Sequence, residues 1–444
     1  MKKLILTAAA IFAVSTTAIA GGLLTNTNQN AAFLRNPSRD AVIAIDGVYS
    51  NPAGTAFLEK GLHLSLSWQA AWQKRQITST FPAYYLNGGA TTKTFEGTAT
   101  APVIPSVQAA YVFNDKWSVS AQFAVGGGGG KCEFDNGLPM FEKLVYSTIA
   151  TGVASHPQLP QGSSVASYTL NQNLVGEQYI YALQVGGTYK FNKNISVFAG
   201  VRGILANTSY VGSITGITAD VKFPAAAGGM VIPGAVQASD LILDCSQSGL
   251  GVQPIIGIDA KLGNWNLAAK YEFRGVINLK NESKNSANVD AMFAAYADGA
   301  RVRSDIPALA TVGAQYSFCD KVRAMAGFHY YFDKDAKGSA TAVSDNTWEI
   351  TFGAEWDITK NFTLSAGVQR TDYGFYNEDM NDLTFNNSST GLCVGASYRV
   401  SKTVNINAGY MHSFYDEHTV KTAVSTENYT RKNDVVGVSV DLKF

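Results

Sequence analysis

The sequence has little charge, and neither sign is in excess. Only 15% of its 444 residues are charged, and 34 basic residues balance 34 acidic ones. Proteins that bind nucleic acid need a basic face, so this balance argues against nucleic acid as a partner. Beyond residue 20 the chain also lacks an uninterrupted apolar run of about 20 residues, which a membrane-spanning helix needs. A helical membrane protein is therefore excluded.

The apolar run at the N-terminus has the layout of a secretory signal peptide, which we predict over residues 1–20. Lys2 and Lys3 precede an apolar stretch, Leu4 to Val14, and Ala18-Ile19-Ala20 fits a small-x-small cleavage site. The alternative is an N-terminal membrane anchor, but the run is too short to span a bilayer. No cysteine lies at the cleavage point, so a lipoprotein is not expected. The mature chain would begin at Gly21 and be exported.

Glycine and aromatic residues are abundant. The chain has 42 Gly, 21 Tyr and 23 Phe, a composition that fits one large transmembrane β-barrel with aromatic residues at both interfaces. Its last residues alternate apolar and polar from Val436 to Phe444, the period of a strand with one lipid-facing side. A chain that ends on the aromatic residue of such a strand resembles the signal that the outer-membrane barrel-assembly machinery reads. We therefore expect that machinery as a partner.

A unit of strand, short polar turn and strand occurs six times, as tight hairpins require. Six hairpins give twelve strands, and a first strand (about Leu62 to Thr78) and a last strand (about Tyr429 to Phe444) make fourteen, an even number as in bacterial barrels. The predicted fold is all-β, a fourteen-stranded antiparallel transmembrane β-barrel. The six units are Tyr111–Val119, Tyr189–Val197, Leu262–Trp265, Phe318–Val322, Trp356–Phe362 and Tyr398–Val404.

Alternation within the strands predicts which side chains face lipid and which face the lumen. In the strand that begins at Trp265, aromatic and aliphatic residues occupy every second position and charged residues the positions between them. A soluble sandwich would also alternate, but its exposed face would carry many more Lys and Glu. The predicted lumenal charged residues are Arg202, Lys270, Glu272, Arg274, Arg323, His329, Glu349 and Glu355.

Long connections are expected on the opposite rim. Two of them are unusually apolar: one contains Leu144 to Ala154, which could form a short helix, and the other contains Phe223 to Pro233. These two loops could form a groove for an apolar ligand, or they could pack on each other and cap the barrel. The predicted connections are 79–100, 131–176, 214–250, 283–301, 333–345, 373–387 and 416–428.

About forty residues, Gly21 to Gly61, lie between the predicted signal peptide and the first strand, and they contain Asn51-Pro52-Ala53. Together with fourteen strands and a terminal Phe, this segment resembles the FadL/TodX family of outer-membrane transporters for long-chain fatty acids and other hydrophobic compounds. The resemblance implies three parts: a signal peptide (1–20), an N-terminal hatch that plugs the barrel (21–60) and the barrel itself (61–444). It also implies that cargo enters from the outer loops, displaces part of the hatch and leaves sideways at an inward kink of the third strand.

Two motifs can be read directly from the residues. Pro52 restricts Asn51 to extended conformations, and the Asn side chain can bond backbone in a turn, so the tripeptide could also be a plain turn into the first strand. Five consecutive glycines, Gly126, Gly127, Gly128, Gly129 and Gly130, follow the third strand's Val125. Glycine in a strand marks bulges and bends, so this run could be the kink, or it could be a flexible entry to the next loop.

Four predicted lumenal cations could contact the head group of a cargo. Arg202, Lys270, Arg274 and Arg323 could each bind a carboxylate. They could equally pair with the acidic residues Glu272, Glu349 or Glu355 and act as struts of the wall.

Two rival functions were weighed. An outer-membrane enzyme needs a positioned nucleophile and base, and none of the five histidines lies in a recognisable nucleophile motif, so no enzyme and no cofactor are predicted. His412 and His418 have a spacing that is generic for a strand end, so no metal is predicted. A porin for polar solutes is favoured by the lumenal charges and opposed by the hatch and the apolar loops. A transporter of this kind could also carry haem or another bulky apolar molecule.

Cys132 and Cys245 fall in the two apolar outer loops and could form a disulfide in an oxidising envelope; the alternative is four free thiols, including Cys319 and Cys393. The overall prediction is a monomer in the outer membrane of a Gram-negative bacterium. Its expected partners are a hydrophobic small molecule, membrane lipid and lipopolysaccharide.

Overall fold

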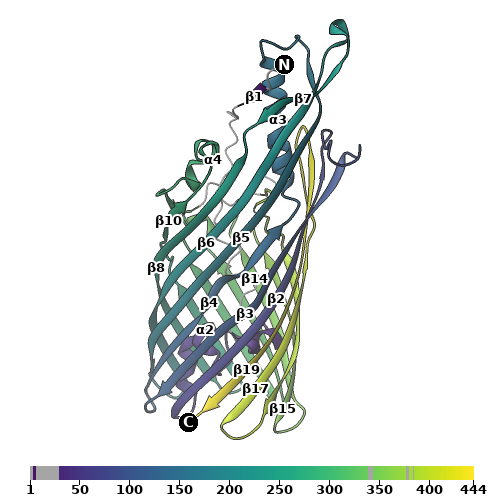
Figure 1. Cartoon of the computed structure of the whole chain (residues 1–444). Helices are drawn as coiled ribbons and strands as arrows, with labels where there is room; N and C mark the ends of the chain where they lie inside the picture. Colours follow the sequence, from purple (N-terminus) through teal and green to yellow (C-terminus); the bar gives the residue numbers. More distant parts are fainter. Residues whose placement is uncertain (1–3, 7–29, 339–343, 377–379, 384) are drawn as a thin grey trace.

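The chain folds into a closed antiparallel β-barrel of fourteen strands (Figure 1). The computed structural model describes residues 4–6, 30–338, 344–376, 380–383 and 385–444. The barrel strands are β2 (Gly61–Thr80), β3 (Thr92–Val112), β4 (Trp117–Phe134), β5 (Ser164–Lys190), β6 (Ile195–Lys222), β8 (Leu241–Leu262), β9 (Trp265–Glu272), β12 (Leu309–Cys319), β13 (Val322–Tyr331), β14 (Trp348–Asp357), β15 (Phe362–Asp372), β16 (Ser389–Arg399), β17 (Val404–Tyr415) and β19 (Thr426–Lys443).

The barrel closes where the last strand pairs with the first along its whole length. The backbone N–H of Leu62 donates to the carbonyl of Phe444 (3.0 Å), and the N–H of Phe444 donates to the carbonyl of Leu62 (2.8 Å). The terminal residue is therefore part of the closing seam. The strand count and the six hairpins are confirmed.

Five short strands are not part of the fourteen-stranded barrel. The helices α1 and α2 lie inside the barrel, and α3 and α4 belong to connections between strands. β10 continues the line of β9 along β8, and β7 and β18 extend the outer ends of their neighbours. The short strands are β1 (Leu4–Leu6), which pairs with β7, β7 itself (Val231–Ala238), β10 (Asn278–Ser283), β11 (Arg301–Arg303) and β18 (His418–Lys421). The helices are α1 (Ala31–Arg35), α2 (Gly47–Ser50), α3 (Pro139–Ser155) and α4 (Ala287–Met292), with 3-10 turns η1 (Pro52–Phe57), η2 (Ala225–Ala227), η3 (Ala294–Tyr296) and η4 (Asp333–Asp335). The rest of the predicted signal peptide lies outside the described residues.

Strands β5, β6 and β8 are much longer than expected, with 27, 28 and 22 residues. The connections predicted at 131–176 and 214–250 are accordingly shorter, at 135–163 and 223–240. Alternation continues beyond the lipid-facing band, where polar residues such as Glu177, Asn207 and Ser248 replace large apolar ones at the outward positions. A strand can therefore go on into water without exposing an apolar face.

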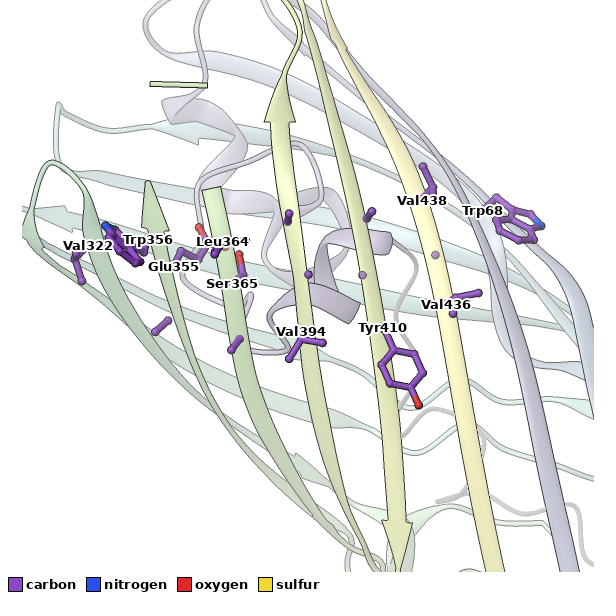
Figure 2. A pocket seen from close by; sticks show the side chains of 17 residues that line it. Trp68, Val322, Glu355, Trp356, Leu364, Ser365, Val394, Tyr410, Val436 and Val438 are labelled. Atoms are coloured by element: carbon purple, nitrogen blue, oxygen red, sulfur yellow. The ribbon is translucent and has the colours of Figure 1, made fainter. Parts of the chain in front are cut away.

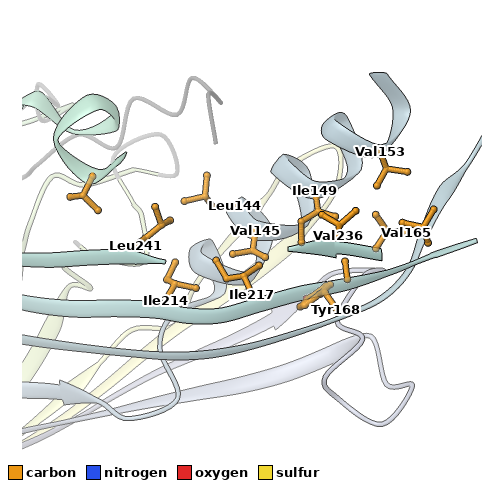
Figure 3. Packing of buried hydrophobic residues seen from close by; sticks show 13 residues of the cluster. Leu144, Val145, Ile149, Val153, Val165, Tyr168, Ile214, Ile217, Val236 and Leu241 are labelled. Carbon is orange, nitrogen blue, oxygen red and sulfur yellow. The ribbon is translucent and has the colours of Figure 1, made fainter. Parts of the chain in front are cut away.

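The two apolar loops pack on each other, which was one of the two possibilities that the sequence left open; the other was a groove for an apolar ligand. α3 places Leu144, Val145 and Ile149 against Ile214 and Leu241 of the extended strands (Figure 3). This confirms the short helix predicted there. In the part of the chain that the structure describes, no helix is both long and apolar enough to cross a membrane.

The predicted alternation of faces is confirmed. Trp265, Phe352 and Trp356 are about half exposed on the outer wall, whereas Glu272 and Glu355 are buried inside the barrel. Inside also lies the segment of residues 30–57, called here the lumenal segment, which contains α1, α2 and η1. Residues 30–41 are all buried, and α1 contacts β15, β16, β17, β19 and β2. Figure 1 shows these short helices within the lower half of the barrel.

Candidate functional site

The lumenal segment begins with a side chain that both caps a helix and binds the wall. Asn30 Oδ1 accepts from the backbone N–H of Ala32 (2.9 Å), which caps α1. Its Nδ2 donates to Ser65 Oγ on β2 (2.8 Å) and to Gln108 Oε1 on β3 (2.9 Å). The start of α1 is thereby fixed at one place on the barrel wall.

A row of inward glycines makes room for the segment, one glycine on each of seven strands from β12 to β19. A Cβ on Gly409 would lie 2.6 Å from the backbone nitrogen of Arg35, and one on Gly395 would lie 2.6 Å from Arg35 Cβ. Any larger side chain in the row would therefore collide with the segment. The row was not predicted from the sequence, although each glycine occupies an inward position in its strand. The row comprises Gly313, Gly327, Gly353, Gly367, Gly395, Gly409 and Gly437.

Buried charges tie the segment to the wall. Glu355 on β14 accepts from three arginines: Arg35 (2.8 Å) and Arg39 (3.0 Å) of the lumenal segment, and Arg323 of β13 (2.7 Å). Arg39 also pairs with Asp46 of the segment (2.7 Å). Because these groups are buried and charged, each hydrogen bond is of the strong, charge-assisted kind.

The Asn51-Pro52-Ala53 motif attaches the other end of the segment to a different part of the wall. Asn51 Nδ2 donates to the carbonyl of Ile258 on β8 (3.0 Å), and Asn51 Oδ1 accepts from the N–H of Ala53 (3.4 Å). Ser196 Oγ of β6 donates to the carbonyl of Ala53 (2.7 Å). The motif thus starts η1 and also joins it to two strands.

The ladder between β3 and β4 is interrupted. Thr100 pairs with Lys131, but the next registered pair is Ser106 with Ala124, so Ala101–Pro105 and Val125–Gly130 lie outside the ladder. β4 also carries two register shifts against β5 within the glycine run, and Gly128 has a left-handed φ of +68°. The glycine run therefore forms a bulged, irregular stretch of strand.

Two prolines lie on the β3 side of this interruption. Their effect on the ladder was not predicted from the sequence. Pro102 and Pro105 have no backbone N–H, so β3 cannot complete the ladder there. Between them, Val103 is 60% exposed on the outer wall. Two prolines three residues apart in an otherwise alternating strand were the available signal.

An apolar patch lines the lumen directly inside the interruption. Ile180, which pairs with Gly127, belongs to a buried cluster that extends from β5 across β6, β10, β12 and β13 and the connections before β10 and β12. Tyr49 of the lumenal segment stands beside this patch, its carbonyl held by Lys270 Nζ (3.0 Å). The space left between them is about 10 Å³, room for about one water molecule. The cluster comprises Ile180, Ile204, Ala206, Ile277, Leu279, Ile306, Leu309 and Tyr331.

The four cations predicted as head-group contacts are all paired with acids of the protein. Arg202 and Lys270 share Glu272, at 2.5 Å and 2.7 Å. Arg323 pairs with Glu355, as described above, and also with Asp357. Arg274 lies just beyond β9, its Nε 3.7 Å from Asp305. These pairs link neighbouring parts of the protein to each other. This fits the second possibility stated above, in which the cations pair with acidic residues of the wall, and not contact with a head group.

Arg75 and Arg431 also face the lumen, and neither forms an ion pair with an acid in the part of the chain that the structure describes. Arg75 of β2 and Arg431 of β19 lie opposite each other in the register. Arg75 lies over the ring of Phe385 (5.8 Å) and Arg431 over the ring of Tyr415 (4.7 Å). Arg431 Nη1 donates to the carbonyl of Phe385 (3.4 Å), whereas its buried Nε has no hydrogen-bond partner within the described ranges of the chain. Their inward position follows from alternation in the first and last strands, but their isolation from acids could not be read from the sequence.

The predicted bridge between Cys132 and Cys245 is wrong. Both are free thiols, and both lie on strands rather than in loops. Cys132 pairs in register with Gly176, Gly176 with Tyr210, and Tyr210 with Cys245, so three strand spacings separate the two sulfur positions. Three spacings amount to about 14 Å, twice the reach of a disulfide.

A groove of about 910 Å³ lies on the outer wall across the strands from β13 to β2 (Figure 2), and its edge at Trp68 adjoins the interruption, because Trp68 Nε1 donates to the carbonyl of Pro102 (3.1 Å). It is shallow because alanines and the glycine row leave the wall thin there, and Trp68, Tyr410 and Trp356 form its edges. It lies on the outward side of the wall, where Trp68, Trp356 and Val438 are exposed.

Comparison with known proteins agrees with this architecture. A family profile described as "Gram-negative porin" matches residues 239–418. The structure resembles that of a FadL homologue from Pseudomonas aeruginosa, with a TM-score of 0.68 and 16% identity over 95% of this chain and 100% of the other. It also resembles the toluene transporter TodX of P. putida (TM-score 0.55, 16% identity, 90% of this chain and 94% of that one) and TbuX of Ralstonia pickettii (0.53, 13%, 90% and 94%). A comparison with curated protein sequences gives no match.

Proposed function

We propose that the protein transports hydrophobic small molecules across the outer membrane of a Gram-negative bacterium and releases them sideways between β3 and β4. The observation that carries this proposal is the interrupted ladder with apolar residues on both sides. Ile180 and its cluster lie inside it, and Val103 is exposed to lipid outside it. An apolar molecule could cross such a gap without entering water. The likeness to FadL and toluene-transporter barrels supports the same function.

The lumenal segment is the plug in this proposal. It occupies the lower lumen, and its Tyr49 fills the space beside the interruption. Cargo must therefore displace this part of the segment before it can leave. A plugged lumen also opposes the alternative of an open porin for polar solutes.

Arg75 and Arg431 are proposed to bind the head group of an acidic cargo such as a long-chain fatty acid. A carboxylate would supply an anion, which neither guanidinium group pairs with among the described residues, in the fork geometry that arginine favours. Arg75 is in register with Gly97 of β3. Gly97 lies four residues nearer the outer end of β3 than Ala101, where the interruption begins. That is about 13 Å along the strand, so an alkyl chain could extend from the arginines toward the gap.

Phe444 in the closing seam is proposed as the residue that the barrel-assembly machinery reads, and the protein acts as a monomer in contact with lipid and lipopolysaccharide. No enzymatic step is part of this function.

The first experiment closes the gap. Replacing Gly126 and Gly127 with Thr, together with Pro102→Thr and Pro105→Thr, restores the missing N–H donors and side chains so that the ladder can form. We expect uptake of labelled oleate by cells that carry this variant to fall to the level of cells without the protein. Heat-modifiable gel mobility verifies that the barrel has folded.

The matched control is Gly187→Thr with Gly203→Thr on β5 and β6. An added Cβ meets nothing within 4 Å at Gly187, and only a carbonyl at 3.8 Å at Gly203. This control should keep its uptake. Wild-type uptake by the variant with the closed ladder would refute lateral release.

The second experiment tests the arginine pair. In Arg75→Gln with Arg431→Gln, affinity for oleate should fall by about tenfold to a hundredfold, since hydrogen bonds to a charged group contribute about 1.5–3 kcal/mol. Affinity for oleyl alcohol, which has no charge, should change little. Lys74→Gln with Lys432→Gln is the control, because these lysines occupy the neighbouring outward positions of the same strands. Equal loss for acid and alcohol would refute the head-group role.

A further inference from the structure

A second cavity opens at the short-turn end of the barrel, the end that faces the periplasm in an outer-membrane protein. It has a volume of about 1200 Å³, and we call it the vestibule. Its ceiling is the lumenal segment with the Glu355 ion-pair cluster, and its rim is made of the turns after β8, β12 and β14 and of the end of β16 at Arg399. It lies at the opposite end of the lumen from Arg75 and Arg431.

The vestibule is positively charged although the whole chain is neutral. The charges of its ceiling balance, because Arg35, Arg39 and Arg323 pair with Glu355, Asp46 and Asp357. The rim contributes four more cations and one more acid, Asp320. Among the described residues, none of these four cations forms an ion pair. The four are Lys261, Lys321, Lys360 and Arg399.

The ceiling also presents an apolar patch to this cavity. Val42, Ile43 and Ala44 line the vestibule and are partly exposed. They are the one run of consecutive partly exposed residues within residues 30–56, where almost every other residue is buried. Three adjacent apolar side chains in a wet cavity are uncommon unless something covers them.

We propose that the vestibule binds organic anions from the periplasm, specifically a carboxylate or a phosphate monoester that carries a short apolar group. The apolar group lies on Val42 to Ala44, and the anion lies among the rim lysines. Lysine suits this role because its ammonium is a flexible point charge that follows an anion of either shape. This site is separate from the proposed transport route, and it does not depend on lateral release.

The test uses the full-length mature protein in lipid nanodiscs, with octanoate as the probe and calorimetry or saturation-transfer NMR as the readout. The variant is Lys261→Gln with Lys321→Gln and Lys360→Gln. Its affinity for octanoate should fall about tenfold, because each exposed charge contributes up to about 1 kcal/mol and 1.4 kcal/mol is a factor of ten. Acetate, which lacks the apolar group, and octylammonium, which has the opposite charge, should bind weakly to the wild type.

The matched control removes three lysines from turns at the same end of the barrel that do not line the vestibule: Lys116→Gln with Lys193→Gln and Lys402→Gln. It should bind octanoate like the wild type. Repeating the titration in the Arg75→Gln, Arg431→Gln background separates this site from the proposed head-group site, so either proposal can fail alone. Equal octanoate affinity in both triple variants, or equal binding of octylammonium, would overturn the vestibule site.

Discussion

Glu355 is the single residue on which docking of the lumenal segment depends most. It is buried and accepts hydrogen bonds from three arginines, two of which belong to the segment. In Glu355→Gln, Arg35, Arg39 and Arg323 lose their shared carboxylate, and one positive charge in the cluster is left without an acid. Breaking a buried ion pair from one side costs about 3–5 kcal/mol. We therefore expect the ratio of docked to undocked segment to fall by about a hundredfold to several thousandfold.

Two assays follow this change. Arg35 and Arg39 are potential trypsin sites that are buried while the segment is docked, so the folded variant should be cut there much faster than the wild type. In planar bilayers the variant should show frequent openings to ions, whereas the wild-type barrel should stay closed.

Asp357→Asn is the matched control. Asp357 lies two residues along the same strand and pairs with Arg323 of the wall (2.8 Å), but not with the segment. It should keep both trypsin resistance and closure. If Glu355→Gln is as resistant and as closed as this control, the ion-pair cluster does not hold the segment, and the reasoning is refuted.

Two further predictions concern the glycine row and an outer loop. Gly409→Val should displace α1 and raise trypsin cleavage, because an added Cβ would lie 2.6 Å from Arg35 N, whereas Gly203→Val on the open side of β6 should not. Overpacking of this kind costs about 1–3 kcal/mol, and unchanged cleavage would contradict the role of the row. Burial raises the pKa of Asp333 in an outer loop from 3.8 to about 6, so the folded loop holds a proton that the unfolded loop releases. The loop should therefore lose stability as the pH rises from about 4 to 6. Hydrogen exchange at the Thr347 amide, which donates to Asp333 (2.9 Å), measures this, and an unaltered pH profile in Asp333→Asn would contradict it.

Local pattern determined the barrel. Strand, turn and face follow from the period of two and from short polar turns, and both are properties of neighbours in the chain. The fourteen strands and the six hairpins were therefore predictable, as were the inward positions of Glu272 and Glu355. The short helix around Ile149 was also predictable, because its apolar run breaks the alternation of the strands around it.

Only the tertiary structure decided which lumenal side chains contact each other. Alternation places Arg202 and Arg75 on the same inner face. It cannot show that Arg202 pairs with Glu272 while Arg75 pairs with no acid among the described residues, because the possible partners lie on different strands and at different heights. Cys132 and Cys245 failed as a pair for the same reason: both are near the outer rim, yet three strand spacings separate them. The interruption of the ladder likewise needs Pro102 on one strand opposite the glycines of another. Which residues of different strands become neighbours depends on the strand register and on the closure of the barrel. No short stretch of sequence specifies either.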